Sequence, residues 1–178
     1  MRSIVTDDFL DNPYELIDLS KNQKYYPRNN QQAYEGIRTD NLFNLNLEFV
    51  TNIASKIVYN YYDKNKSYNI DGLLLLHKLS NKDLTDPNWI NSRIHQDNCI
   101  LSNILYLNPN AKMSWGTQIY RKENNKHIPD IIYHNKFNRL IQFPGYVDHS
   151  AISFDGDEER LTLLFFLEKI EERDKNEQ

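Results

Sequence analysis

Two side chains suited to metal chemistry stand two positions apart in the middle of the chain, His95 and Asp97. Residues at this spacing on an extended strand point to the same face, so the imidazole and the carboxylate would face one site. With a second imidazole they would form a two-histidine, one-carboxylate triad, which leaves open positions on a ferrous ion. The pair needs further context, because a chain with 5 His and 25 Asp and Glu residues can produce this spacing by chance.

His149 and Arg160 supply that context. His149 follows a predicted turn at Pro144-Gly145 and lies in a segment with strand character. Arg160 begins an apolar strand, and on the inward face of a barrel its guanidinium would need an anionic partner. The carboxylate of a ligand, held by two parallel hydrogen bonds, would be such a partner. The residues expected on the same strand face are Thr162, Leu164 and Phe166.

These residues also have plain structural interpretations. His95 and Asp97 could be a surface pair. Arg160 could form a surface salt bridge with one of its acidic neighbours, which are Asp157, Glu158 and Glu159. The other histidines lack a suitably placed carboxylate or strand context, and we interpret them as ordinary polar residues: His77, His127 and His134.

The elements that must position these side chains are strands that follow a helical first third. Asp8 can cap a helix over residues 12–19, and residues 41–62 place apolar side chains on one face of a helix of about four or five turns. Residues 23–40 have the composition of an ordered loop. From residue 69 onward, eight short segments have strand composition: 70–79, 89–95, 100–107, 117–121, 130–133, 137–143, 146–152 and 160–167.

This order of elements predicts an α+β fold that is mainly β. Eight short strands are typical of a sandwich or barrel, and the helices would pack on one face of a β-barrel or jelly roll. The turns carry fitting residues at Asn108-Pro109-Asn110, Pro144-Gly145 and Asp155-Gly156-Asp157. We expect a single domain over residues 1–178, with mostly helical support at 1–66, the barrel at 67–168 and a charged, frayed tail at 169–178.

The composition excludes several classes of protein. A net charge of −4, with no cluster of Lys and Arg, argues against a nucleic-acid partner. The longest apolar runs are too short to cross a membrane, and the first eight residues become acidic before a signal-peptide core can form. The single Cys99 cannot form an internal disulfide, so we expect a reducing, cytoplasmic location.

In order and approximate spacing, His95-x-Asp97, His149 and Arg160 resemble the Fe(II)/2-oxoglutarate-dependent dioxygenases, and the prolyl-hydroxylase-like branch in particular. Three other stretches are similar to that branch: Tyr-Leu-Asn at 106–108, Trp-Gly-Thr at 115–117, and the strand at 136–143 that leads to the second histidine. The resemblance covers roughly residues 70–167.

The resemblance implies a double-stranded β-helix, a jelly-roll or cupin-like barrel with N-terminal supporting helices. It implies that His95, Asp97 and His149 bind Fe(II), and that Arg160 and Tyr106 bind the distal carboxylate of 2-oxoglutarate. The implied reaction uses O₂ and 2-oxoglutarate to hydroxylate a substrate, with release of succinate and CO₂. The Asp97 carboxylate favours hydroxylation, because the halogenating members of the family lack the acidic ligand.

The substrate is not specified, and the family's range leaves a peptide, an amino acid or another small molecule. Candidate pocket residues are Arg38, Arg93, Trp115 and Tyr120, although aromatic side chains in a small barrel usually belong to the core. The loops expected to determine specificity are residues 25–40 and 110–134. Tyr106 has a similar alternative, as a core aromatic residue at a strand end.

Two other functions stay open. The first is a non-catalytic barrel of the same fold that binds a metal or a small acid as a sensor or structural module. The second is a cupin-like metalloenzyme that needs no 2-oxoglutarate. The sequence carries no prediction of oligomeric state.

Overall fold

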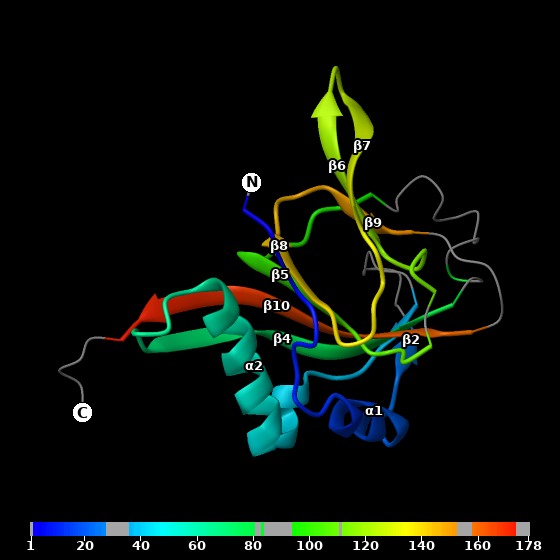
Figure 1. Cartoon of the computed structure of the whole chain (residues 1–178). Coiled ribbons are helices and arrows are strands. Elements are labelled where there is room, and N and C mark those ends of the chain that lie inside the picture. The colour runs from blue at the N-terminus through cyan, green and yellow to red at the C-terminus, as the bar shows by residue number, and fades with distance from the viewer. Residues whose placement is uncertain are drawn as a thin grey trace.

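Two antiparallel sheets form the framework of the structure, which is a computed structural model that describes residues 2–27, 36–80, 83, 94–110, 112–152 and 158–173 (Figure 1). The larger sheet has the strand order β1 (Ile4–Thr6), β8 (Leu140–Pro144), β5 (Leu101–Tyr106), β10 (Arg160–Glu172), β4 (Tyr68–Leu79), β3 (Ile37–Arg38) and β2 (Tyr26–Pro27). The smaller sheet has the order β7 (Lys126–Tyr133), β6 (Thr117–Glu123) and β9 (His149–Ala151).

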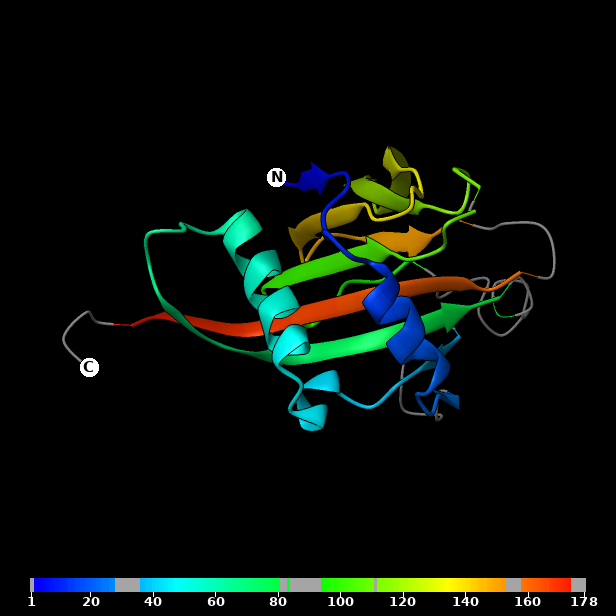
Figure 2. The same ribbon diagram turned by 60° about the horizontal axis from the view of Figure 1, so that its bottom comes forward.

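The larger sheet is covered on both faces. The helices α1 (Tyr14–Lys21) and α2 (Glu48–Tyr61) lie against one face, as Figure 2 shows. The smaller sheet packs on the other face, where Ile119 and Tyr133 join a buried cluster with side chains of β5, β8 and β10. A central strand of such a sheet must therefore be apolar on both sides.

The strand β10 meets this requirement through its alternating side chains. Leu161, Leu163, Phe165 and Leu167 belong to the buried cluster on the helical side. Leu164 belongs to the cluster on the other side, together with the partly buried Phe166. Arg160 lies on this second face as well, because it alternates with these residues along the strand. The prediction that Arg160 shares a face with Leu164 and Phe166 agrees with the strand pairing.

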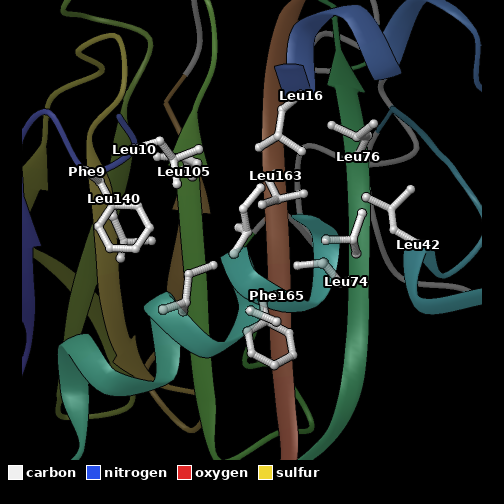
Figure 3. Close-up of a cluster of buried hydrophobic side chains, with 14 of the residues drawn as sticks. Phe9, Leu10, Leu16, Leu42, Leu74, Leu76, Leu105, Leu140, Leu163 and Phe165 are labelled. Carbon is white, nitrogen blue, oxygen red and sulfur yellow. The ribbon is translucent and has the colours of Figure 1, made fainter. Parts of the chain in front are cut away.

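The main hydrophobic core lies between the helices and β5, β10 and β4 (Figure 3). The helix α2 contributes one buried stripe, consisting of Val50, Ile53, Ala54, Ile57 and Val58. Leu16 of α1 and Leu42 are fully buried in the same cluster, opposite Leu74, Leu76 and Leu163. The first helices and the later strands thus share one core.

The prediction of a single helix over residues 41–62 is wrong in its first turn. The structure has a short 3₁₀ helix, η1 (Leu42–Leu45), and α2 begins only at Glu48. The side chain of Asn41 accepts a hydrogen bond from the backbone of Phe43, which starts η1. Asn46 then takes the left-handed conformation, with φ 52°, and this ends η1. The break lets Leu42 reach the core.

Three short strands lie where the sequence predicts helix or loop. β1 pairs with β8 at the edge of the larger sheet, within the segment expected to be helical support. β2 and β3 lie within the predicted loop 23–40 and extend the opposite edge, where β3 pairs with β4 and β2 pairs with β3. Strands of two or three residues are too short to show an alternating pattern in the sequence. They form because their backbones pair with neighbouring strands.

The charged segment that begins at Glu168 is not a frayed tail through Glu172, because β10 continues to that residue. Its backbone pairs with β4 as far as Tyr68, and Ile170 packs against the core. The extension also has an ion pair between Lys66 and Glu172, at 2.7 Å. The four charged residues of this extension are exposed, and Ile170 is the one apolar residue among them. Residues 174–178 lie outside the described part of the chain.

The mainly β fold class is confirmed, and most of the predicted strands are present with shifted ends. β6 and β7 are longer than expected, since a two-residue turn at Asn124-Asn125, both with positive φ, joins them as a hairpin. Most of the predicted strand 89–95 and the turn 155–157 lie outside the described residues. Within those residues, neither helix has the length and apolar character needed to cross a membrane.

A bidentate ion pair ties the N-terminal segment to the start of β8. Arg139 donates from Nε to Oδ1 of Asp7 at 2.6 Å and from Nη2 to Oδ2 at 3.0 Å. These hydrogen bonds lower the pKa of Asp7 to about 2. Arg139 therefore serves as the partner of an acidic residue of the N-terminal segment.

We expect Asp7→Asn to lower the free energy of unfolding by about 1 kcal/mol at neutral pH, a modest value because Asp7 is partly exposed. The pKa of Asp7 is lower in the folded state, so its contribution is present above the unfolded value of 3.8 and is lost as the pH falls through about 2. Urea unfolding of both proteins at neutral and acidic pH measures the difference. A difference that persists unchanged at about pH 2 would contradict this account, and Asp18→Asn in an exposed pair is the control.

Candidate metal centre

Three side chains with metal-ligating atoms converge between the two sheets. The ligand atoms of His95, Asp97 and His149 all lie within 4.8 Å of one another. Nε2 of His95 is 3.7 Å from Oδ1 of Asp97, and Nε2 of His149 is 3.4 Å from Oδ2. The structure therefore brings together the three residues that the sequence predicts as ligands. Two imidazole nitrogens and one carboxylate oxygen on a single side suit a divalent first-row metal with open positions.

Backbone pairing holds the two histidines side by side. The amide of His95 donates to the carbonyl of His149 at 3.0 Å, and the amide of His149 donates back at 2.9 Å. The Asp97 amide donates to the carbonyl of Gly145 at 2.8 Å. A Cβ at Gly145 would lie 2.2 Å from the carbonyl oxygen of Cys99, so only glycine permits this approach.

Neighbouring groups orient the candidate ligands. The hydroxyl of Ser102 donates to Oδ2 of Asp97 at 2.6 Å, which fixes the carboxylate rotamer. Nδ1 of His149 lies 2.9 Å from the carbonyl of Val147, and because a carbonyl only accepts, Nδ1 must carry the proton. The lone pair of His149 is then on Nε2, which faces Asp97.

The protonation state of His149 also suits metal binding. Its side chain is buried, and this burial lowers its pKa to about 4 against the opposing effect of the Asp97 carboxylate. The imidazole is therefore neutral at neutral pH, which is the form that binds a metal.

The candidate ligands line a cavity with an empty volume of about 500 Å³. This volume includes the part of the cavity that is open to solvent. Its opposite wall comes from the larger sheet, with Arg160, Leu164 and Phe166 of β10 among the lining residues. β5, which bears Tyr106, pairs with β10, and the segment of His95 pairs with β9.

Arg160 is buried, with 4% of its surface exposed. Its Nη1 donates to the carbonyl oxygens of Trp115, at 3.2 Å, and Gly116, at 2.9 Å. Gly116 has to be glycine, since a Cβ there would lie 2.0 Å from the carbonyl oxygen of Tyr133. The guanidinium is therefore anchored on one side to the backbone while the residue lines the cavity.

Tyr106 is fully buried, and its hydroxyl lies 2.8 Å from Oγ1 of Thr117. Burial raises the pKa of Tyr106, so the phenol stays protonated at neutral pH. Thr117 lines the cavity, and Tyr106 stands behind it within the apolar cluster. A role for Tyr106 in binding a co-substrate carboxylate stays a prediction, and Thr117 is a residue that the sequence analysis missed.

The candidate pocket residues divide into three groups. Arg38 lines the cavity, and its role as a substrate contact stays a prediction. The Trp115 side chain is 1% exposed and packs with Leu79, so its assignment to a substrate pocket is wrong and it belongs to the core. Tyr120 is not among the described residues that line the cavity; its hydroxyl is 3.0 Å from that of Ser150. Arg93 lies outside the described residues.

His77 is also part of the cavity wall, a position that its interpretation as an ordinary polar residue did not include. It lies in β4 and is 6% exposed. One signal could have identified it, because a single histidine in the otherwise apolar run from Leu73 to Leu79 takes the face opposite to that of Leu74 and Leu76.

The fold is that of the Fe(II)/2-oxoglutarate oxygenases. The structure is similar to an oxidoreductase of the 2OG-Fe(II) oxygenase family from Burkholderia pseudomallei, with a TM-score of 0.61 at 10% identity, covering 93% of this chain and 84% of that one. It is similar to the non-heme alpha ketoglutarate dependent epimerase SnoN from nogalamycin biosynthesis, with a TM-score of 0.65 at 10% identity. This match covers 98% of this chain and 81% of the epimerase. It is also similar to a prolyl hydroxylase from Trichoplax adhaerens, solved with a peptide fragment of hypoxia inducible factor, with a TM-score of 0.59 at 14% identity, covering 93% and 82%.

By sequence the chain belongs to a family described as a family of unknown function, DUF6445, which matches residues 2–129. No curated protein matches it. The matched residues include His95 and Asp97, whereas His149 and Arg160 lie beyond them.

Ser102 provides a test of the metal centre, because it contacts Asp97 without facing a metal itself. We expect Ser102→Ala to weaken the binding of Co(II) by about tenfold or more, since partners that orient a ligand usually contribute that much to metal affinity. Titration calorimetry measures the dissociation constant. The control is Ser20→Ala, a buried serine in α1 whose hydroxyl donates to the carbonyl of Ile17. Equal affinities in the two variants would contradict a role for Ser102 at the metal.

Proposed function

We propose that this protein is an Fe(II)- and 2-oxoglutarate-dependent oxygenase of the hydroxylase type. The observation that carries the proposal is the meeting of His95, Asp97 and His149 in one cavity with Arg160, in a fold shared with such enzymes. Its substrate would be a peptide, an amino acid or another small molecule.

The residues fit the metal in number and kind. His95, Asp97 and His149 would hold Fe(II), and two imidazoles with one carboxylate leave positions open on the cavity side. When bound, the iron with 2-oxoglutarate and O₂ supplies the oxidising chemistry, with release of succinate and CO₂. The acidic Asp97 among the ligands favours hydroxylation over halogenation.

Arg160 would bind the distal carboxylate of 2-oxoglutarate. Its hydrogen bonds to the carbonyls of Trp115 and Gly116 restrict the guanidinium before any ligand arrives, which reduces the entropy lost on binding. Charge-assisted hydrogen bonds to a carboxylate are stronger in a buried site than at the surface. The hydroxyl of Thr117, held by Tyr106, would donate to the same carboxylate.

The apolar wall would exclude water from the reacting groups. Leu79, Ile104, Leu164 and Phe166 line the cavity around the polar residues. Exclusion of water strengthens electrostatic interactions in the site and limits side reactions of an oxidising centre. No protein base is required for this chemistry, so the role of the chain is to bind, orient and shield.

The first test is spectroscopic. We expect the anaerobic addition of Fe(II) and 2-oxoglutarate to give the weak metal-to-ligand charge-transfer absorption of such sites, and His149→Ala to abolish it because the variant lacks one ligand. Ser20→Ala, remote from the cavity, should keep the band. Absence of the band from the wild type would overturn the proposal.

The second test concerns Arg160. We expect Arg160→Ala to raise the half-saturating concentration of 2-oxoglutarate in succinate formation by about tenfold or more, since a charge-assisted pair is lost. The control is Arg121→Ala, which removes an exposed arginine paired with Glu123. Turnover that is indifferent to Arg160→Ala would favour a cupin-like enzyme without 2-oxoglutarate. Binding of 2-oxoglutarate without any succinate would favour the non-catalytic module.

A further inference from the structure

A second group of cationic and imidazole side chains faces the cavity from the strands beside β10. Arg38 of β3 and His77 of β4 line the cavity together with the candidate ligands and Arg160. Arg38 is the Cα partner of His77, and His77 is the partner of Thr162 on β10. Directly opposed residues of paired strands point to the same face, so the three side chains form one row across the cavity wall.

The row formed by Arg38, His77 and Thr162 lies apart from the guanidinium of Arg160. Arg160 turns towards the carbonyls of Trp115 and Gly116, whereas the guanidinium carbon of Arg38 lies 5.3 Å from the centre of the Phe166 ring. Phe166 pairs with Ser102, the residue that holds Asp97. Arg38 therefore reaches towards the end of the wall that carries the metal ligands, and Arg160 towards the other end.

The backbone is shaped to bring Arg38 over this wall. Gly36, two residues earlier, has a φ of +77°, which few other residues adopt. A Cβ there would lie 2.2 Å from the carbonyl oxygen of Lys78 and 2.9 Å from Nε2 of His77. A glycine at this position allows β3 to approach β4 closely and sets Arg38 beside His77.

The charges of the wall suit an anion. Among the described residues that line the cavity, two are guanidiniums, Arg38 and Arg160, and one is a carboxylate, Asp97. A bound ferrous ion would add further positive charge, and 2-oxoglutarate would bring its carboxylates to the iron and to Arg160. The planar fork of Arg38, resting on an aromatic ring, is suited to hold a further carboxylate by two hydrogen bonds, with His77 as an added donor.

We propose that Arg38 and His77 bind a carboxylate of the substrate, so that the oxygenase acts on an acid. This inference rests on the proposed function and adds the substrate class to it. The carboxylate can belong to a free small acid, such as an amino acid, or to an acidic residue of a peptide. Both sources present the same group to Arg38.

The experiment compares acids with their amides at saturating 2-oxoglutarate, so that Arg160 is already occupied. The probes are the free L-amino acids against the L-amino acid amides, and short peptides containing Asp or Glu against the same peptides with Asn or Gln. Succinate formation is followed for the wild type, Arg38→Gln, His77→Phe and the surface control Arg121→Gln. Equilibrium binding of the same probes to Ni(II)-loaded protein gives a second readout that needs no turnover.

We expect either the free amino acids or the acidic peptides to bind and to stimulate succinate formation. Their amides should bind at least about tenfold more weakly, since an amide cannot form the charge-assisted pair. Arg38→Gln should remove this preference for acids, and Arg121→Gln should keep it. Stimulation by free amino acids identifies a small acid as the source, and stimulation by acidic peptides alone identifies a peptide. Should Arg38→Gln fail to fold, Arg38→Lys and His77→Phe provide the comparison.

Two results would overturn the inference: amides that act as well as acids, or an acid preference unchanged in Arg38→Gln. The inference would also be overturned if none of the acids tested bound more tightly than its amide. Failure of the proposed function looks different, because succinate would then be absent in every arm while the acid preference in binding, and its loss in Arg38→Gln, would still be measurable.

Discussion

The structure depends on one strand, β10, being buried on both faces. Its side chains alternate between the helical core, filled by Leu161, Leu163 and Phe165, and the cavity, lined by Arg160, Leu164 and Phe166. A shift of one residue in its pairing would exchange the two sets, placing a guanidinium in the apolar core and removing it from the site. The pairing of β10 with β4 over most of its length prevents such a shift. The hydrophobic core therefore determines where the charge of the site lies.

The smaller sheet has the complementary task of holding the candidate ligands. His95 and His149 are joined by reciprocal backbone hydrogen bonds, and Asp97 is held through the carbonyl of Gly145 and the hydroxyl of Ser102. Two of the candidate ligands are thus oriented by groups that are not candidate ligands themselves, Asp97 by Ser102 and His149 by the carbonyl of Val147, as is usual for metal sites in proteins. Because Ser102 lies on β5 of the larger sheet, it also connects Asp97 to the opposite wall of the cavity.

Similarity of fold to 2-oxoglutarate oxygenases does not identify a reaction, since one fold supports many functions. The neighbours illustrate this, because they include an epimerase and a prolyl hydroxylase. The functional argument for this member of a family of unknown function therefore depends on its own residues. The ligand atoms converge, a buried guanidinium lines the same cavity, and Arg38 and His77 extend the polar part of the wall.

The sequence by itself predicted the mainly β class and the inward face of Arg160 from residue types and the two-residue period of a strand. It predicted the grouping of His95, Asp97 and His149 from their resemblance to a known family. It could not predict β2 and β3, whose two residues carry no pattern, nor the break at Asn46, which depends on one left-handed residue. The tertiary structure was needed to decide that Trp115 is core rather than pocket, that Thr117 stands in front of Tyr106, and that His77 joins Arg38 on the cavity wall. The reason is physical: periodicity assigns a side chain to a face of its own strand, whereas its neighbours across the sheet depend on pairing between residues far apart in the chain.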